Sequence, residues 1–215
     1  ALDCLRPFAG VVEDLSISRD GYHGSEVNPQ QARIARQAAT QLGIPVDFIC
    51  VTGSEATEEQ ARTGQFPTDD ASVLYRGRAA EKLAARVQPK SWHQFTECKW
   101  EELRNPGRVH VDAYGNLHVC QGSSIGNLFE NSLAGIMSSY DPVAHPVVGP
   151  VLVGGPIELV KRYRLPHEQT YADACHLCYA SRNQLRNRLS DVLTPCQMYG
   201  EKGEKPPTRP GIQPL

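Results

Sequence analysis

The sequence has no large excess of either charge and no long apolar stretch. Its 22 basic and 24 acidic side chains leave a formal net charge of −2, so nothing indicates the positive surface that binding to nucleic acid or anionic membranes requires. No apolar run approaches the length that spans a bilayer, and the N-terminus lacks the charged and apolar regions of a signal peptide. We therefore expect a cytoplasmic protein that binds neither nucleic acid nor membrane.

The chain also lacks internal repeats, and its cysteines do not suit a secreted disulfide framework. With 215 residues, 40% of them hydrophobic, it can bury the core of one large domain or two small ones. It begins with Ala1 instead of methionine, which suggests a processed product or a piece of a longer protein. The cysteine count is seven, and in a reducing compartment a C-x2-C pair is more often a metal or redox site than a disulfide.

Strands and helices alternate in the first part of the chain. Residues 10–24 predict a buried strand that ends in an Asp-Gly turn, and residues 45–51 predict a second strand. Between them the pattern predicts a helix that is capped by Asn28 and stopped by Gly43. A further helix is expected over residues 74–87. This alternation favours βα units around a parallel sheet.

The second part of the chain has a different character. Residues 107–122 alternate like two strands around Ala-Tyr-Gly-Asn and predict a β-hairpin. Asn131 is expected to cap a short helix, and residues 141–155 to form a connection rich in proline and glycine before a helix that Pro156 starts. A longer helix is expected from Ala172 to Leu189. Three arginines of this helix are interpreted as a solvated surface: Arg182, Arg186 and Arg188.

These patterns predict an α/β protein in three parts. Residues 1–90 provide only two or three βα units, whereas a closed eight-fold barrel takes about 250 residues, so we expect an incomplete βα barrel there. Residues 91–200 are expected to form a small α+β domain with a β-hairpin and helices. The tail, residues 201–215, has too few apolar side chains to order itself.

Four cysteines are candidate metal ligands in the second part. Cys175 and Cys178 fall in the first turns of the expected long helix, where positions three apart share a face. Cys120 ends the second strand of the hairpin, and Cys98 precedes the first strand. Thiolate ligands select zinc or an iron–sulfur cluster over hard cations. The spacing leaves these two metals as alternatives.

Other interpretations of these residues remain open. Cys98 and Cys120 could be small buried apolar residues, since free cysteine is among the most buried residue types. Cys196 could replace Cys98 as a ligand, although we rank Cys98 first. His118 lies two residues before Cys120 and His176 lies beside Cys175, so a mixed cysteine and histidine zinc site is a further alternative.

Two segments of the second part resemble the auxiliary-cluster domain of radical S-adenosylmethionine (SAM) enzymes, of the SPASM or shorter twitch type. The first is GNLHVC, residues 115–120, a G-x4-C unit on the hairpin, and the second is SIGNLFENSLAGIM, residues 124–137. In that family a cysteine, the G-x4-C hairpin, an Ile-Gly-Asn-Leu segment and a later C-x2-C hold an additional 4Fe-4S cluster. The resemblance covers Cys98 to about Cys196. It implies one cluster bound by Cys98, Cys120, Cys175 and Cys178.

A third segment resembles the barrel of the same family. LSISRDGYHG, residues 15–24, is similar to a middle strand of the radical SAM barrel, where Ser-x-Asp-Gly ends a strand near the SAM pocket. The resemblance implies that Ser16, Ser18 and Asp20 belong to that pocket.

The chain also departs from the family. Radical SAM chemistry needs a C-x3-C-x2-C loop that binds the SAM-cleaving cluster, and the sequence contains no such triplet. The resemblance therefore implies the C-terminal portion of a radical SAM enzyme, unable to cleave SAM alone. Its expected partners are the missing N-terminal half or a peptide or protein substrate. No cysteine lies between Cys178 and Cys196, so a single auxiliary cluster is expected. A zinc-stabilised binding module without catalytic activity is the alternative function.

Overall fold

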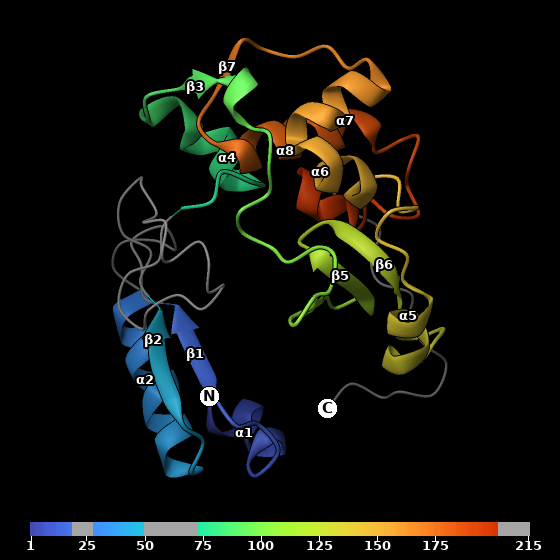
Figure 1. Ribbon diagram of the computed structural model, residues 1–215. Coiled ribbons are helices and arrows are strands. Elements are labelled where there is room, and N and C mark those ends of the chain that lie inside the picture. The colour runs from blue at the N-terminus through green and yellow to red at the C-terminus, as the bar shows by residue number, and fades with distance from the viewer. Residues whose placement is uncertain (19–27, 50–72, 202–215) are drawn as a thin grey trace. The chain divides into compact units, whose positions relative to one another are not determined.

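The computed structural model describes residues 1–18, 28–49 and 73–201, and these fall into two compact units, Ala1–Val73 and Leu74–Leu215 (Figure 1). The fold is mixed α/β with short strands in small sheets, and the described residues contain no closed barrel. Residues 74–90, which the sequence pattern groups with the first part, belong to the second unit. Among the described residues, no helix has both the length and the apolar character that crossing a bilayer requires. The expected tail lies outside the described residues from position 202 onward.

The first unit contains the predicted strand–helix–strand arrangement. Strand β1 (Leu15–Ser18) pairs in parallel with β2 (Val46–Ile49), and α2 (Asn28–Gln41) lies between them in the chain. Gly43 ends α2 with φ +69°, and the Ile44 amide donates to a carbonyl of the last helical turn. The parallel sheet and the helix are therefore confirmed. Among the described residues of this unit, the buried apolar ones are Ala32, Ala38, Ala39 and Ile44.

Two details of the first unit differ from the prediction. The described part of the strand predicted over residues 10–24 is limited to β1, and two short helices, α1 (Leu2–Leu5) and η1 (Arg6–Phe8), precede it. The apolar positions of α2 also predict that Ile34 is buried, but its side chain is 49% exposed, whereas Ala32, Ala38 and Ala39 are buried.

The second unit begins with a helix shorter than the sequence predicts. The segment 74–87 forms α4 (Arg78–Lys82) and the 3-10 turn η3 (Ala84–Arg86) instead of one continuous helix. Gly77, the residue before α4, has φ +54°, which is outside helical geometry. The chain at the start of this segment is therefore extended and enters the helix only after a glycine turn.

The predicted hairpin is confirmed and is extended by a strand that was not predicted. β4 (His110–Val111) pairs antiparallel with β5 (Asn116–Cys120), and β5 pairs antiparallel with β6 (Ser123–Asn127). The register of β5 against β6 shifts twice near His118. Such bulges increase the local twist and re-aim side chains at the end of a strand, and here the re-aimed end carries Cys120.

The next helix, α5 (Leu133–Ser139), packs on β6. Its cap is Ser132, whose hydroxyl accepts the Gly135 amide at 3.1 Å, so the predicted cap at Asn131 is wrong by one residue. Gly126 of β6 allows the close approach, because a Cβ there would lie 2.9 Å from the Ile136 side chain.

Three helices form the centre of the second unit. α6 (Val148–Gly154) contacts α7 (Pro156–Tyr163), and α7 contacts α8 (Ala174–Leu185) (Figure 1). Pro156 begins α7 as predicted, but α6 falls in the segment predicted as an irregular connection. The main core lies between these helices and the sheet, and its fully buried members include Val119, Val147, Leu159, Leu185 and Leu193.

A second apolar cluster lies where the chain returns to the start of α8. The short strands β3 (Lys90–Ser91) and β7 (Thr170–Tyr171) pair antiparallel, and the 3-10 turn η4 (Trp92–Gln94) follows β3. The residues of this cluster are Trp92, Phe95, Ile157, Val160, Tyr171 and Leu177. It fixes the N-terminal end of α8 against α7. The last described element is η5 (Cys196–Tyr199).

Candidate metal centre

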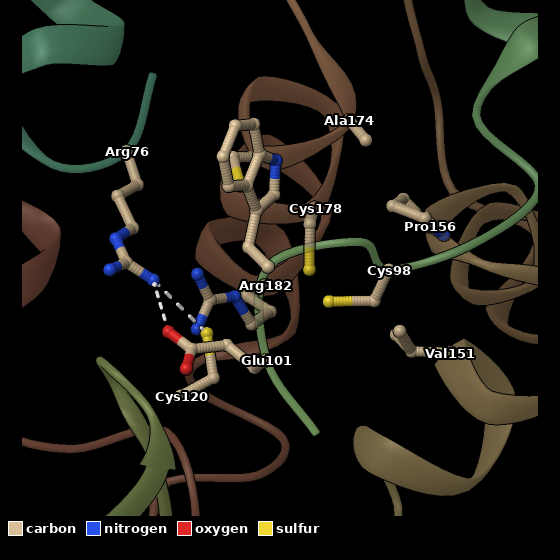
Figure 2. Close-up of a pocket in the computed structure, with 11 residues that line it drawn as sticks. Arg76, Cys98, Glu101, Cys120, Val151, Pro156, Ala174, Cys178 and Arg182 are labelled. Carbon is tan, nitrogen blue, oxygen red and sulfur yellow. Dashed lines mark hydrogen bonds and ion pairs between the residues drawn. The ribbon is translucent and has the colours of Figure 1, made fainter. Parts of the chain in front are cut away.

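Four cysteines from three separate segments line one pocket of the second unit, which we name the cysteine pocket. They are Cys98, Cys120, Cys175 and Cys178, and the cavity between them has a volume of about 20 Å³. In Figure 2 the side chains of Cys98 and Cys178 point toward the same space, and Cys120 lies beside Arg182. The structure therefore brings together all four residues that the sequence singled out as metal ligands.

The C-x2-C pair is placed by the start of α8. Asp173 caps the helix, because its carboxylate accepts the His176 amide at 2.7 Å, and this puts Cys175 and Cys178 in the first two turns. A helix N-terminus carries partial positive charge, which favours the thiolate form of a nearby cysteine. The predicted position of the pair on a helix start is confirmed.

Cys120 is held opposite this pair by an arginine of the same helix. Arg182 Nη1 donates to the carbonyl of Gln121 at 2.8 Å and to the hydroxyl of Ser123 at 3.0 Å. These acceptors belong to the turn between β5 and β6, so Arg182 connects the end of the hairpin to α8. Tyr199 anchors the same turn, since its hydroxyl donates to the Gly122 carbonyl.

The interpretation of the arginines on α8 as solvated surface is wrong for Arg182. Its side chain is buried, with 2% exposure, and its guanidinium lies 5.9 Å from the centre of the Tyr199 ring. Its pKa is raised: burial acts in the opposite direction, but Tyr199 and the pocket cysteines outweigh it. Farther along the chain, Arg186 pairs with Glu201, and the exposed Arg188 lies over the Tyr163 ring.

Cys98 is positioned by the crossing of its leading segment over the junction of α6 and α7. Gly155, at this junction, would place a Cβ only 2.3 Å from backbone atoms of Thr96 and Glu97, so no larger residue fits there. The Phe95 carbonyl accepts the Ile157 amide across the same contact. Burial raises the pKa of the Cys98 thiol, and hydrogen bonds from the backbone amides of Trp100 and Glu101 offset part of this rise. Hydrogen bonds of this kind are common around cysteine ligands of metals.

A second arginine, half-buried, contacts the pocket from the segment before α4. Arg76 Nη1 lies 3.4 Å from Cys120 Sγ and 3.2 Å from Glu101 Oε1 (Figure 2). Glu101 also accepts from Arg108 Nη2 at 3.2 Å, and His110 Nε2 lies 3.8 Å from it. Burial opposes ionisation of Glu101, but the hydrogen bond of His110 and the charges of Arg76 and Arg108 lower its pKa. Glu101 is therefore a carboxylate that holds cations next to the pocket.

Three of the pocket cysteines, Cys98, Cys175 and Cys178, resist ionisation because their pKa values are raised. Burial and the neighbouring Cys120 raise the pKa of Cys98 to about 12. Burial and the nearby Asp173 carboxylate raise the pKa of Cys175, and burial also raises that of Cys178. A metal ion or cluster would supply the positive charge that four adjacent thiolates need.

The histidines near these cysteines have other partners. His118 Nε2 donates to the Asp112 carboxylate at 3.0 Å, within the turn that begins the hairpin. His176 Nδ1 accepts the Ala172 amide at 3.2 Å. Burial lowers the pKa of both imidazoles, and neither residue lines the cysteine pocket.

The remaining cysteines lie elsewhere. Cys196 begins η5 and does not line the pocket, and Cys4 is an exposed residue of α1 in the first unit. Cys50 lies outside the described residues. The structure thus places Cys98, and not Cys196, with the other three cysteines of the pocket.

The residues that the family resemblance assigns to the SAM pocket, Ser16, Ser18 and Asp20, belong to the first unit. Ser16 and Ser18 share the exposed face of β1, and the Ser16 hydroxyl donates to the Asp14 carboxylate at 3.3 Å. Asp20 lies outside the described residues. No role in binding SAM is tested by this geometry, so that assignment stays a prediction.

The sequence did not predict that two further residues, Arg76 and Glu101, line the pocket. Arg76 lies 44 positions from Cys120 in the chain, and no local pattern connects the two.

In the part of the chain that the structure describes, no three or more histidine, cysteine, aspartate or glutamate side chains form a group that could hold a metal ion as they stand. Comparison with protein-family models, curated proteins and solved structures found no significant match.

Proposed function

We propose that the second unit binds one 4Fe-4S cluster and transfers electrons through it, as the auxiliary-cluster domain of a radical SAM enzyme. The observation that carries the proposal is the meeting of Cys98, Cys120, Cys175 and Cys178 around one pocket. These residues come from three chain segments that have no other reason to place four thiols together. If the four cysteines were only buried apolar residues, they would not need to lie around the same pocket.

The donor set of the pocket fits a cluster. Four sulfur atoms are soft ligands, which select zinc or iron–sulfur clusters. The thiolates carry more negative charge than one divalent metal ion neutralises, and the buried guanidinium groups of Arg76 and Arg182 offset the excess. Apolar groups complete the lining, among them Val151, Pro156 and Ala174.

The resemblance to the SPASM and twitch domains favours iron–sulfur over zinc. When bound, a 4Fe-4S cluster accepts and donates single electrons. Four cysteine ligands leave no iron open for a substrate, so the pocket residues favour electron relay over substrate binding. Cys120 would hold the cluster from the end of β5, Cys98 from the segment that crosses the junction of α6 and α7, and Cys175 and Cys178 from α8.

We also propose that the chain acts as part of a radical SAM enzyme and does not cleave SAM alone. The sequence has no C-x3-C-x2-C triplet, so the SAM-cleaving cluster has no ligands here. The first unit, with its parallel β1–β2 pair and α2, would contribute Ser16, Ser18 and Asp20 to the SAM pocket. The remaining wall of that pocket, and the substrate, would come from the missing half or from a peptide or protein partner.

Metal analysis of anaerobically purified protein tests the proposal. The expected result is a brown protein with about four irons and four acid-labile sulfides per chain. A colourless protein with one tightly bound zinc and no sulfide would reject the cluster and support the zinc-stabilised module. A protein without stoichiometric metal after anaerobic reconstitution would reject both.

Single substitutions test the ligand set. Alanine at Cys98, Cys120, Cys175 or Cys178 should lower the iron content, and for Cys175→Ala we also expect lower solubility and a lower melting temperature. A structural metal site can contribute on the order of 10 kcal/mol to folding, which is comparable to the stability of a whole domain. The matched control is Cys196→Ala, which should keep its iron. Full metal and an unchanged melting temperature in Cys175→Ala would exclude this residue as a ligand.

A further inference from the structure

Arg76 touches a candidate ligand sulfur directly and is immobilised by a carboxylate. Its Nη1 atom lies 3.4 Å from Cys120 Sγ and 3.2 Å from Glu101 Oε1. The side chains of Arg76 and Glu101 are 15% and 5% exposed. An arginine that only paired with Glu101 would not need to reach a sulfur atom.

Glu101 fixes the arginine in place because it is itself held from two sides. Its Oε2 atom accepts from Arg108 Nη2 at 3.2 Å, while Oε1 faces Arg76 at 3.2 Å and His110 Nε2 at 3.8 Å. The carboxylate follows Cys98 by three positions, and the Glu101 amide interacts with the Cys98 sulfur. A single short segment therefore provides one ligand and also orients the cation that contacts another.

Arg182, the other arginine of the pocket, makes different contacts. Arg182 Nη1 is occupied by the Gln121 carbonyl and the Ser123 hydroxyl. It holds the turn after Cys120, whereas Arg76 donates to the Cys120 sulfur itself. The two arginines can thus be separated by experiment.

Hydrogen bonds and positive charges at ligand sulfurs favour the reduced form of an iron–sulfur cluster, because reduction adds negative charge there. A guanidinium stays protonated at all physiological pH values, so its contribution does not depend on pH. The low exposure of the pair limits screening by solvent.

We propose that Arg76, oriented by Glu101, raises the reduction potential of the cluster through its hydrogen bond to Cys120, and so makes this unit a better electron acceptor. This inference rests on the proposed 4Fe-4S function. Arg76 is a positioning and tuning residue and ligates nothing. Its effect appears in the potential of the cluster and not in the iron content.

The test is a redox titration of the reconstituted full chain, followed by absorbance and electron paramagnetic resonance. Arg76→Gln removes the charge at similar size, and it should lower the reduction equilibrium constant about tenfold, or about 59 mV for a one-electron couple. Arg76→Lys keeps the charge but loses the planar donor geometry, so a smaller decrease is expected. Arg162→Gln, an exposed arginine of α7, is the matched control and should match the wild type.

The outcomes separate this inference from the proposed function. A wild-type protein without iron and sulfide refutes both. A loaded cluster whose potential is the same in Arg76→Gln and Arg162→Gln refutes the inference and leaves the cluster assignment standing. If Arg76→Gln does not fold, Arg76→Lys decides, because an unchanged potential in that variant also refutes the role of the hydrogen bond.

Discussion

Replacement of Gly155 by alanine should damage the cysteine pocket without touching a cysteine. Gly155 has φ +68° and ψ −166°, a region nearly restricted to glycine, which costs other residues about 1–3 kcal/mol. An added Cβ would lie 2.3 Å from the Thr96 carbonyl carbon and from the Glu97 nitrogen. Overpacking costs about 1–3 kcal/mol more, so we expect a loss of about 2–6 kcal/mol in the free energy of unfolding.

The colliding atoms are backbone atoms immediately before Cys98, so they cannot rotate away as a flexible side chain would. The segment must shift by about 1 Å to restore ordinary contact distances, and Cys98 moves with it. We therefore expect Gly155→Ala to lose iron as well as stability. A change of this size in the position of one ligand is large compared with the tolerance of about 0.2 Å for metal–ligand distances.

Gly77→Ala is the matched control in the same unit. Gly77 has φ +54° and ψ −135°, which is also unfavourable for alanine, but the nearest atom to an added Cβ is the Met198 carbonyl oxygen at 3.7 Å. The assay is urea unfolding of the apo and the reconstituted protein, together with iron content per chain. Equal destabilisation and equal iron in the two variants would refute the argument that the contact at Gly155 positions Cys98.

Three further predictions concern other residues of the second unit. Arg182→Met should destabilise the protein by about 3 kcal/mol, because the Gln121 carbonyl and the buried Ser123 hydroxyl lose their donor, and it should lower the iron content. Arg162→Met is its exposed control, and equal urea midpoints would contradict the prediction. Stability should fall as the pH decreases below about 6.5, because burial lowers the pKa of His145 and the unfolded chain therefore binds the extra proton. His145→Gln should flatten this dependence in urea unfolding measured between about pH 7 and 5, whereas His93→Gln, at an exposed position, should not. Ser132→Ala should cost about 1 kcal/mol in the same assay through loss of the cap of α5, and an unchanged midpoint would show that the cap does not contribute.

Local patterns in the sequence were sufficient where local geometry decides the structure. The stop signal after α2 gave the end of the helix, because Gly43 adopts the positive φ that ends a helix. The hairpin followed from alternation around Gly115, whose φ of +80° suits a turn. The helix expected from Ala172 to Leu189 is observed as α8, Ala174–Leu185, so it starts two residues later and ends four residues earlier than expected, and both cysteines still fall in its first turns. Cys175 and Cys178 were therefore placed correctly from the sequence.

The parts that were missed depend on contacts between distant segments. β6 has the sequence SSIGN, which lacks an apolar alternation, and it becomes a strand by pairing with β5. α6 contains glycine and proline and forms because Val148 and Val151 are buried in the core. Arg182 was taken as a surface residue because its acceptors lie about 60 positions earlier in the chain. A polar residue can be buried wherever the fold supplies hydrogen-bond partners, and the neighbouring sequence does not identify those partners.

The order of the ligands along the chain has a consequence for biosynthesis. Cys98 and Cys120 leave the ribosome well before α8 is made, and the turn after Cys120 has no arginine to hold it until Arg182 has also emerged. Because translation proceeds from the N-terminus, the early thiols are exposed to oxidants during this interval. Under the proposed function, cluster insertion must follow completion of α8, because two of the four ligands, Cys175 and Cys178, lie on that helix.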